Sequence, residues 1–220
     1  MSGIFVTGTD TDVGKTYVGT LLAAQLVKNG SRVIPKKPIE SGCQNMNGRL
    51  IPADASALKQ AAAYEGDLSE VCAYRFEASL SPVRAAHLEN KKVTIEQLSQ
   101  VCKYSGDDFV LVEGAGGFYS PLADDGLNAD LAEALQLPIL LVAEDRLGCI
   151  NQILLTAEAI ANRGLKLTAV VLNAKDPQEN SDMNNAEDLH EFVDTPIYAL
   201  QHAKNNEDVI KDLSNYLQSL

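Results

Sequence analysis

The hydrophobic positions of this chain fall into short continuous runs, separated by segments in which apolar residues recur every three or four positions. Continuous runs rich in Val, Ile and Leu are typical of strands buried on both faces of a sheet, whereas the longer repeat indicates helices. The runs predict a first strand that begins at residue 3 and six further strands at residues 32–35, 71–76, 108–113, 137–143, 167–173 and 196–200.

Capping residues place helices between these strands. Asn29-Gly30 ends the first helix, Ser81-Pro82 begins another, and Thr94 with Gln97 predicts a capping box. The other predicted helices cover residues 53–64, 128–136, a long segment that ends at 162, 183–192 and 206–217. Because strands alternate with helices, we expect one α/β domain over residues 1–220, with a mostly parallel central sheet flanked by helices on both faces.

Two segments lack periodicity. Residues 43–52 predict a polar surface loop, and residues 174–185 a polar, mobile one. Asp54 lies where the helix after the first of these loops begins. Its spacing favours a helix N-cap over a metal ligand, although both remain open.

The first strand leads into Gly8-Thr9-Asp10-Thr11-Asp12-Val13-Gly14-Lys15-Thr16, which opens a helix. This order is typical of a phosphate-binding loop, because backbone N–H groups and the helix dipole point at one spot. In such a loop Lys15 reaches the β/γ-phosphates and the Thr16 hydroxyl binds Mg²⁺. Five residues separate Gly8 from Gly14 instead of the usual four. The segment predicts a P-loop NTPase-like fold.

Further polar residues follow the other predicted strands. The second strand is followed by Lys36 and Lys37, and the run at 108–112 by Glu113 and a glycine-rich turn. Carboxyl ends of parallel strands meet at one edge of the sheet, where ligands bind. An acidic residue there is typical of Mg²⁺ coordination, and Asn173 could hydrogen-bond a base edge. The lysine pair could equally be a solvated turn, were it not for the neighbouring loop.

Charge and cysteine content narrow the function classes. Asp and Glu total 30 against 18 Lys and Arg, so the net charge of −12 argues against nucleic-acid or anionic-membrane partners. The four cysteines show no zinc-ligand spacing, and no apolar run is long enough to span a bilayer. We therefore expect a cytoplasmic protein with free thiols.

The absence of two motifs argues against two classes of enzyme. The chain contains no Gly-x-Ser-x-Gly elbow of a serine hydrolase, and no Gly-x-Gly-x-x-Gly follows its first strand, as it would in a dinucleotide oxidoreductase. Phosphoryl transfer from Mg²⁺-ATP to a molecule held near Lys37 and Ser41 remains.

Together these motifs resemble those of the dethiobiotin synthetase family. The resemblance rests on the loop at residues 8–16, Lys37-Pro38 with Ser41-Gly42, Asp54 at a helix start, and the segments 112–117 and 147–151, in register to about residue 173. It implies ATP-dependent carboxylation and ring closure of 7,8-diaminononanoate with CO₂ or bicarbonate to dethiobiotin. The steps would pass through a carbamate and a carbamic-phosphoric anhydride, releasing ADP and phosphate in biotin biosynthesis.

The resemblance also implies a role for each motif residue. Mg²⁺ would be held by Thr16, Asp54 and Glu113. The catalytic residues would be Thr11, Lys15, Lys37 and Ser41, with Lys37 stabilising the carbamate. ATP would contact Asp12, Val13, Gly14, Lys15, Thr16, Tyr17, Asp54, Glu113, Gly114, Ala115, Gly116 and Asn173. The substrate would contact Lys37, Ser41, Gly117, Leu147, Gly148, Cys149, Ile150 and Asn151.

The family expectation includes a homodimer, in which the helix start at residues 147–151 reaches the substrate carboxylate bound by the neighbouring subunit. Two alternatives come from other classes. One is a regulatory NTPase of the partitioning and septum-site type, which normally carries a second lysine early in the loop, where this chain has Thr9-Asp10. The other is a small-molecule kinase.

Overall fold

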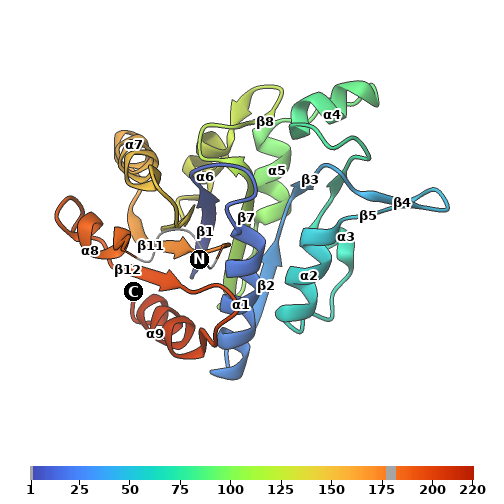
Figure 1. Cartoon of the computed structure of the whole chain (residues 1–220). Helices are drawn as coiled ribbons and strands as arrows, with labels where there is room; N and C mark the ends of the chain where they lie inside the picture. Colours follow the sequence, from blue (N-terminus) through green and yellow to red (C-terminus); the bar gives the residue numbers. More distant parts are fainter. Residues whose placement is uncertain (1, 177–181) are drawn as a thin grey trace.

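A six-stranded parallel sheet forms the centre of the molecule, seen in a computed structural model that describes residues 2–176 and 182–220 (Figure 1). The strand order is β12-β11-β10-β1-β7-β2. The strands are β1 (Gly3–Gly8), β2 (Val33–Lys36), β7 (Phe109–Gly117), β10 (Ile139–Glu144), β11 (Leu167–Asn173) and β12 (Ile197–Leu200). Every pairing between them is parallel, so their carboxyl ends share one edge, as the alternation of strands and helices predicts.

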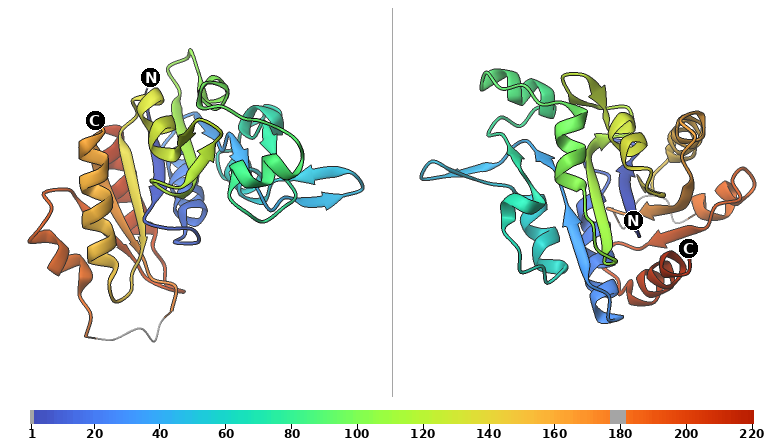
Figure 2. Two further views of the ribbon diagram at one scale, coloured as in Figure 1. Left: turned by 90° about the horizontal axis from the view of Figure 1, so that it is seen from above. Right: turned by 180° about the vertical axis from the view of Figure 1, so that it is seen from behind.

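Helices cover both faces of this sheet (Figure 2). On one face lie α1 (Lys15–Lys28), α2 (Ala53–Ala61) and α9 (Glu207–Gln218). On the other lie α5 (Ile95–Cys102), α6 (Asn128–Leu135) and α7 (Cys149–Asn162). Successive strand residues face opposite layers: Phe5 packs toward α5 and α6, and its neighbour Val6 packs toward α1. The predicted α/β architecture is therefore confirmed.

Three short helices complete the described helices: α3 (Leu68–Val71), α4 (Pro82–Leu88) and α8 (Asn185–His190). The predicted capping box of α5 is present, because the Thr94 hydroxyl accepts from Gln97 N at 3.3 Å while the Gln97 amide oxygen accepts from Thr94 N at 2.9 Å. Part of the predicted mobile segment, residues 177–181, lies outside the described residues. Among the described helices, none is long and apolar enough to cross a membrane.

The prediction of a loop at residues 43–52 is wrong. Strands β4 (Gln44–Met46) and β5 (Arg49–Ile51) pair as an antiparallel hairpin that projects from the molecule in Figure 1. The two residues between them, Asn47 and Gly48, have φ values of 54° and 85°. Positive φ at both central positions is what a two-residue type I′ hairpin requires, and Asn-Gly is its preferred sequence. Both strands are only three residues long and lack alternating apolar residues, which is why the periodicity missed them.

Two further predictions need correction. The strand expected at 71–76 is only β6 (Tyr74–Arg75), which pairs with β3 (Ile39–Glu40), because Val71 belongs to α3, capped by Asp67. Asp54 is not the N-cap of α2: the cap position is Pro52, and Asp54 lies within the first turn. Another short pair, β8 (Pro121–Ala123) with β9 (Gly126–Leu127), precedes α6.

Candidate active site

The loop between β1 and α1 leaves a helix N-terminus open to a ligand. Gly14 occupies the N-cap position with φ 101°, and no side chain caps the helix there. A Cβ at Gly14 would lie 2.1 Å from Asn173 Nδ2, so only glycine fits both the conformation and the space. The N–H groups of the first helical turn thus remain available to an anion such as a phosphate.

Asn173 joins the end of β11 to this loop. Its Nδ2 donates to the carbonyl of Val13 at 3.0 Å, and the residue is 6% exposed. The amide therefore holds the loop against the sheet edge. Its predicted contact with the nucleotide base stays a prediction.

Lys15 lies at the start of α1 and folds back over the loop. Its Nζ donates to the carbonyl of Asp10 at 2.9 Å, and the residue is buried. Burial, reinforced by the nearby ammonium of Lys37, lowers the pKa of Lys15 to about 8, although Glu113 opposes the shift. An anionic ligand would offset both the burial of the Lys15 ammonium and its repulsion by Lys37.

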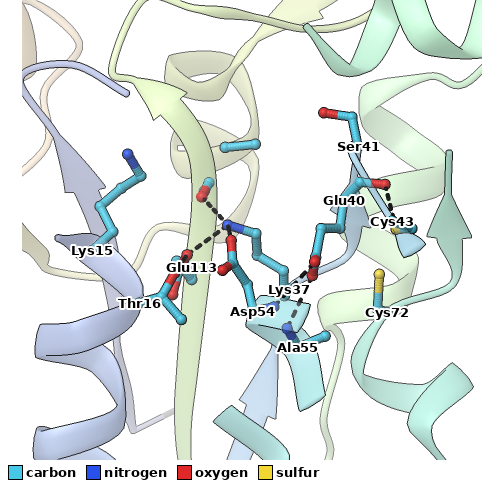
Figure 3. A network of polar contacts seen from close by, with 12 residues as sticks. Lys15, Thr16, Lys37, Glu40, Ser41, Cys43, Asp54, Ala55, Cys72 and Glu113 are labelled. Carbon is cyan, nitrogen blue, oxygen red and sulfur yellow. Dashed lines mark hydrogen bonds and ion pairs between the residues drawn. The ribbon is translucent and has the colours of Figure 1, made fainter. Parts of the chain in front are cut away.

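Lys37 stands at the centre of a buried ion-pair cluster (Figure 3). Its Nζ donates to Glu113 Oε1 at 2.5 Å and to the carbonyl of Gly114 at 3.0 Å, and lies 3.2 Å from Asp54 Oδ2. Burial alone would lower the pKa of Lys37, but Glu113 and Asp54 outweigh it and hold the pKa above its usual range. The ammonium is therefore permanently charged at neutral pH.

Thr16 and Glu113 form the other side of the cluster. The Thr16 hydroxyl donates to Glu113 Oε1 at 2.8 Å, whereas Glu113 Oε2 is buried without a hydrogen-bond partner in the described structure. The described residues contain no group of three or more His, Cys, Asp or Glu side chains that could enclose a metal. Two carboxylates and a hydroxyl nevertheless match Mg²⁺, which takes oxygen ligands and uses few protein groups when substrate phosphates supply the rest. The unpartnered oxygen fits that requirement.

Glu40 belongs to this region, although the sequence analysis missed it. Its two carboxylate oxygens accept from the backbone N–H groups of Asp54 and Ala55 at 3.0 and 2.9 Å. Burial raises the pKa of Glu40, and these hydrogen bonds partly offset the shift. The only sequence signal is its place three residues after Lys37.

A cavity of about 590 Å³ brings most of the predicted residues together. The Ser41 hydroxyl at its rim donates to the carbonyl of Leu80 at 2.6 Å, which ties the segment before α4 to the cavity wall. Among the predicted residues, those that line it are Thr11, Asp12, Gly14, Lys15, Thr16, Tyr17, Lys37, Ser41, Asp54, Glu113, Ala115 and Gly116.

The predicted substrate residues at the start of α7 lie apart from this cavity. Gly148 is the N-cap with φ 89°, Cys149 is buried, and Leu147 is 76% exposed. Gly117 lines a different hollow of about 540 Å³, between the β7 end and the α7 residues Leu155 and Thr156. Within the described chain, the α7 start and the phosphate loop therefore do not share one pocket.

Comparisons with known proteins support the fold. A family model described as an AAA domain matches residues 2–208. The cell division ATPase MinD of Pyrococcus furiosus superposes with a TM-score of 0.57 at 16% identity, covering 100% of this chain and 99% of that one, and the MinD cell division protein of Aquifex aeolicus with 0.56 at 15%. At such identity these likenesses show the fold alone.

Curated relatives match more closely in sequence. An ATP-dependent dethiobiotin synthetase from Ruthia magnifica is 37% identical over 97% of this chain and 98% of its own length. Those from Vesicomyosocius okutanii and Rhodopirellula baltica are 40% and 39% identical, over 79% and 89% of this chain and 79% and 82% of their own lengths. The chain belongs to the ATP-dependent dethiobiotin synthetase family.

Proposed function

We propose that this chain catalyses the ATP-dependent closure of 7,8-diaminononanoate and CO₂ to dethiobiotin, a step of biotin biosynthesis. One amine adds to CO₂ to form a carbamate and gives up a proton. The carbamate oxygen then takes the γ-phosphoryl group from ATP, which leaves ADP. The second amine attacks the activated carbonyl carbon, phosphate departs, and the cyclic urea is closed.

The observation that carries this proposal is the position of Lys37 relative to the phosphate loop. A buried, permanently charged ammonium and Lys15 line the same cavity as the open N-terminus of α1. Both carbamate formation and phosphoryl transfer build negative charge on oxygen, which fixed positive groups in a dry site stabilise. Lys37 would face the carbamate, and Lys15 with Thr11 would face the phosphates.

Thr16, Asp54 and Glu113 would hold Mg²⁺, which would neutralise charge on the phosphates. The same two carboxylates contact Lys37 in the structure described above. With Mg²⁺ held there, Lys37 would lie beside the phosphate that the carbamate attacks. Ser41, fixed through the Leu80 carbonyl, would orient the carbamate from the opposite wall.

The substrate carboxylate would be bound by the α7 start, residues 147–151, of a second subunit. This proposal accounts for the separation of these residues from the cavity of their own chain. It makes the homodimer part of the substrate site. Four free, buried cysteines support placing the protein in the reducing cytoplasm.

The test supplies purified protein with 7,8-diaminononanoate, bicarbonate, Mg²⁺ and ATP, and follows ADP and cyclic urea by chromatography with mass spectrometry. ADP and dethiobiotin are expected in equal amounts. ADP without substrate-dependent cyclic urea contradicts the proposal, and a stable phosphorylated product indicates a small-molecule kinase instead.

A matched pair of variants tests the role of Lys37. Lys37→Ala is expected to bind ATP like the wild type but to lose turnover by about 100-fold or more, as when one fixed charge-stabilising donor is removed. Lys36→Ala is the control, because Lys36 is equally buried but donates to the Glu70 carbonyl, away from the cavity. Equal turnover in the two variants would remove Lys37 from its assigned role.

A further inference from the structure

Helix α2 lacks a capping side chain of its own. Its N-cap residue is Pro52, whose side chain has no hydrogen-bonding atom and so cannot cap the helix. The first N–H groups of a helix need acceptors, and burying them unpaired is costly. Glu40 supplies both acceptors from another segment, with Oε1 on Asp54 N and Oε2 on Ala55 N.

Glu40 is itself firmly anchored. The residue is 6% exposed, and β3 pairs with β6 through Glu40 opposite Arg75. The Glu40 carbonyl accepts from Phe76 N at 3.0 Å, and Cys43 N donates to the Phe76 carbonyl at 2.9 Å. A carboxylate held by two strands is a rigid support for the helix that it caps.

The segment that contains Glu40 therefore contacts Asp54 twice, once at its side chain and once at its backbone. Lys37 lies 3.2 Å from the Asp54 carboxylate, and Glu40 accepts the hydrogen bond of the Asp54 backbone at 3.0 Å. Figure 3 shows Lys37 and Glu40 on either side of the start of α2, where Asp54 and Ala55 lie. Because the Asp54 side chain is 42% exposed, the backbone contact is the more rigid of the two.

We infer that Glu40 is a positioning residue of the active site: by capping α2 it holds the Asp54 carboxylate beside Lys37 and at the Mg²⁺ position. This inference rests on the proposed function, in which Asp54 is a metal ligand. Partners that orient a metal ligand commonly change metal affinity or activity by about 10- to 100-fold when they are removed.

The experiment compares Glu40→Ala and Glu40→Gln with Thr94→Ala. Thr94 caps α5, on the opposite face of the sheet, so its loss removes a helix cap without touching the cavity. Mn²⁺ binding to each folded protein is titrated by electron paramagnetic resonance with a non-hydrolysable ATP analogue present. The Mg²⁺ concentration for half-maximal turnover and the melting temperature are measured beside it.

Glu40→Ala is expected to weaken Mn²⁺ binding and to raise the half-saturating Mg²⁺ concentration by about tenfold. Glu40→Gln keeps one acceptor oxygen and should lie between it and the wild type. Thr94→Ala should lower the melting temperature while leaving both metal measurements unchanged.

Two outcomes overturn the inference: wild-type metal binding in a folded Glu40 variant, or an equal loss in Thr94→Ala. If Glu40→Ala does not fold, Glu40→Gln decides the question. Absence of dethiobiotin formation by the wild type would instead refute the proposed function, and the Mn²⁺ titration would still test Glu40.

Discussion

Replacing Lys37 by Met should destabilise the fold far more than the same change at its neighbour Lys36. Both lysines are buried, at 3% and 6% exposure, but their partners differ. Lys37 neutralises Glu113, whose side chain is fully buried, whereas Lys36 Nζ donates to the carbonyl of Glu70 at 2.7 Å. Burial lowers the pKa of Lys36, while the two carboxylates raise that of Lys37.

The magnitude follows from the charge that each variant leaves behind. Removing one partner of a buried ion pair costs about 3 to 5 kcal/mol, because the remaining charge is uncompensated. At about 2 to 4 °C per kcal/mol for a chain of this size, the lower figure predicts a fall in Tm of about 6 to 12 °C for Lys37→Met. Lys36→Met loses one hydrogen bond but also removes a buried charge, and the two effects oppose each other. We therefore expect the free energy of unfolding to change by no more than about 1.5 kcal/mol.

The assay is thermal and urea unfolding followed by circular dichroism, with a chelator present and without nucleotide, because bound ligands would add stability of their own. Glu113→Gln is combined with each lysine variant. The double variant Lys37→Met/Glu113→Gln should be more stable than Lys37→Met alone, since the buried Glu113 charge is gone and the remaining Asp54 carboxylate is partly exposed, whereas Glu113→Gln should not rescue Lys36→Met. Additive losses for Lys37 and Glu113, or equal losses for the two lysines, would refute the reasoning.

Two further predictions test the loop and the core. Gly14→Ala should abolish ATP binding, measured by calorimetry, because its Cβ would displace the Asn173 amide; Gly30→Ala has a similar φ of 90° but open space and should bind ATP normally. Burial raises the pKa of Cys72 to about 12, so its thiol should resist alkylation at pH 8 in the native protein and react at once in urea; fast native labelling would contradict this.

The sheet and its functional edge could be predicted because both depend on local patterns. Apolar runs such as Val110–Val112 identify buried strands, and the alternation with helices makes those strands parallel. Parallel strands then deliver Lys37 and Glu113 to the same edge without further information. Predicting the sheet and this edge did not require knowing any contact between side chains.

Contacts between distant segments could not be predicted. Asp54 has the position and chemistry of a helix cap, and the sequence favoured that interpretation over a metal ligand. The carboxylate that actually caps α2 belongs to Glu40, 14 residues earlier in the chain. A local cap pattern cannot reveal an acceptor that a neighbouring strand brings in, and the same limit hides the pairing of Lys37 with Glu113 across 76 residues.

The adjacent lysines show why residue type alone does not locate a candidate catalytic group. Lys36 ends β2 and directs its ammonium to the Glu70 carbonyl of α3, whereas Lys37 directs its ammonium to Glu113, which lies within β7. Successive residues of an extended chain point to opposite sides, so only one of them can face the phosphate loop. The neighbouring strand β7 determines which one: its Glu113 carboxylate keeps Lys37 charged, and the second Glu113 oxygen has no hydrogen-bond partner among the described residues. Both positions already carry lysine, so it is the surroundings of each side chain that make Lys37, and not Lys36, the candidate for the site.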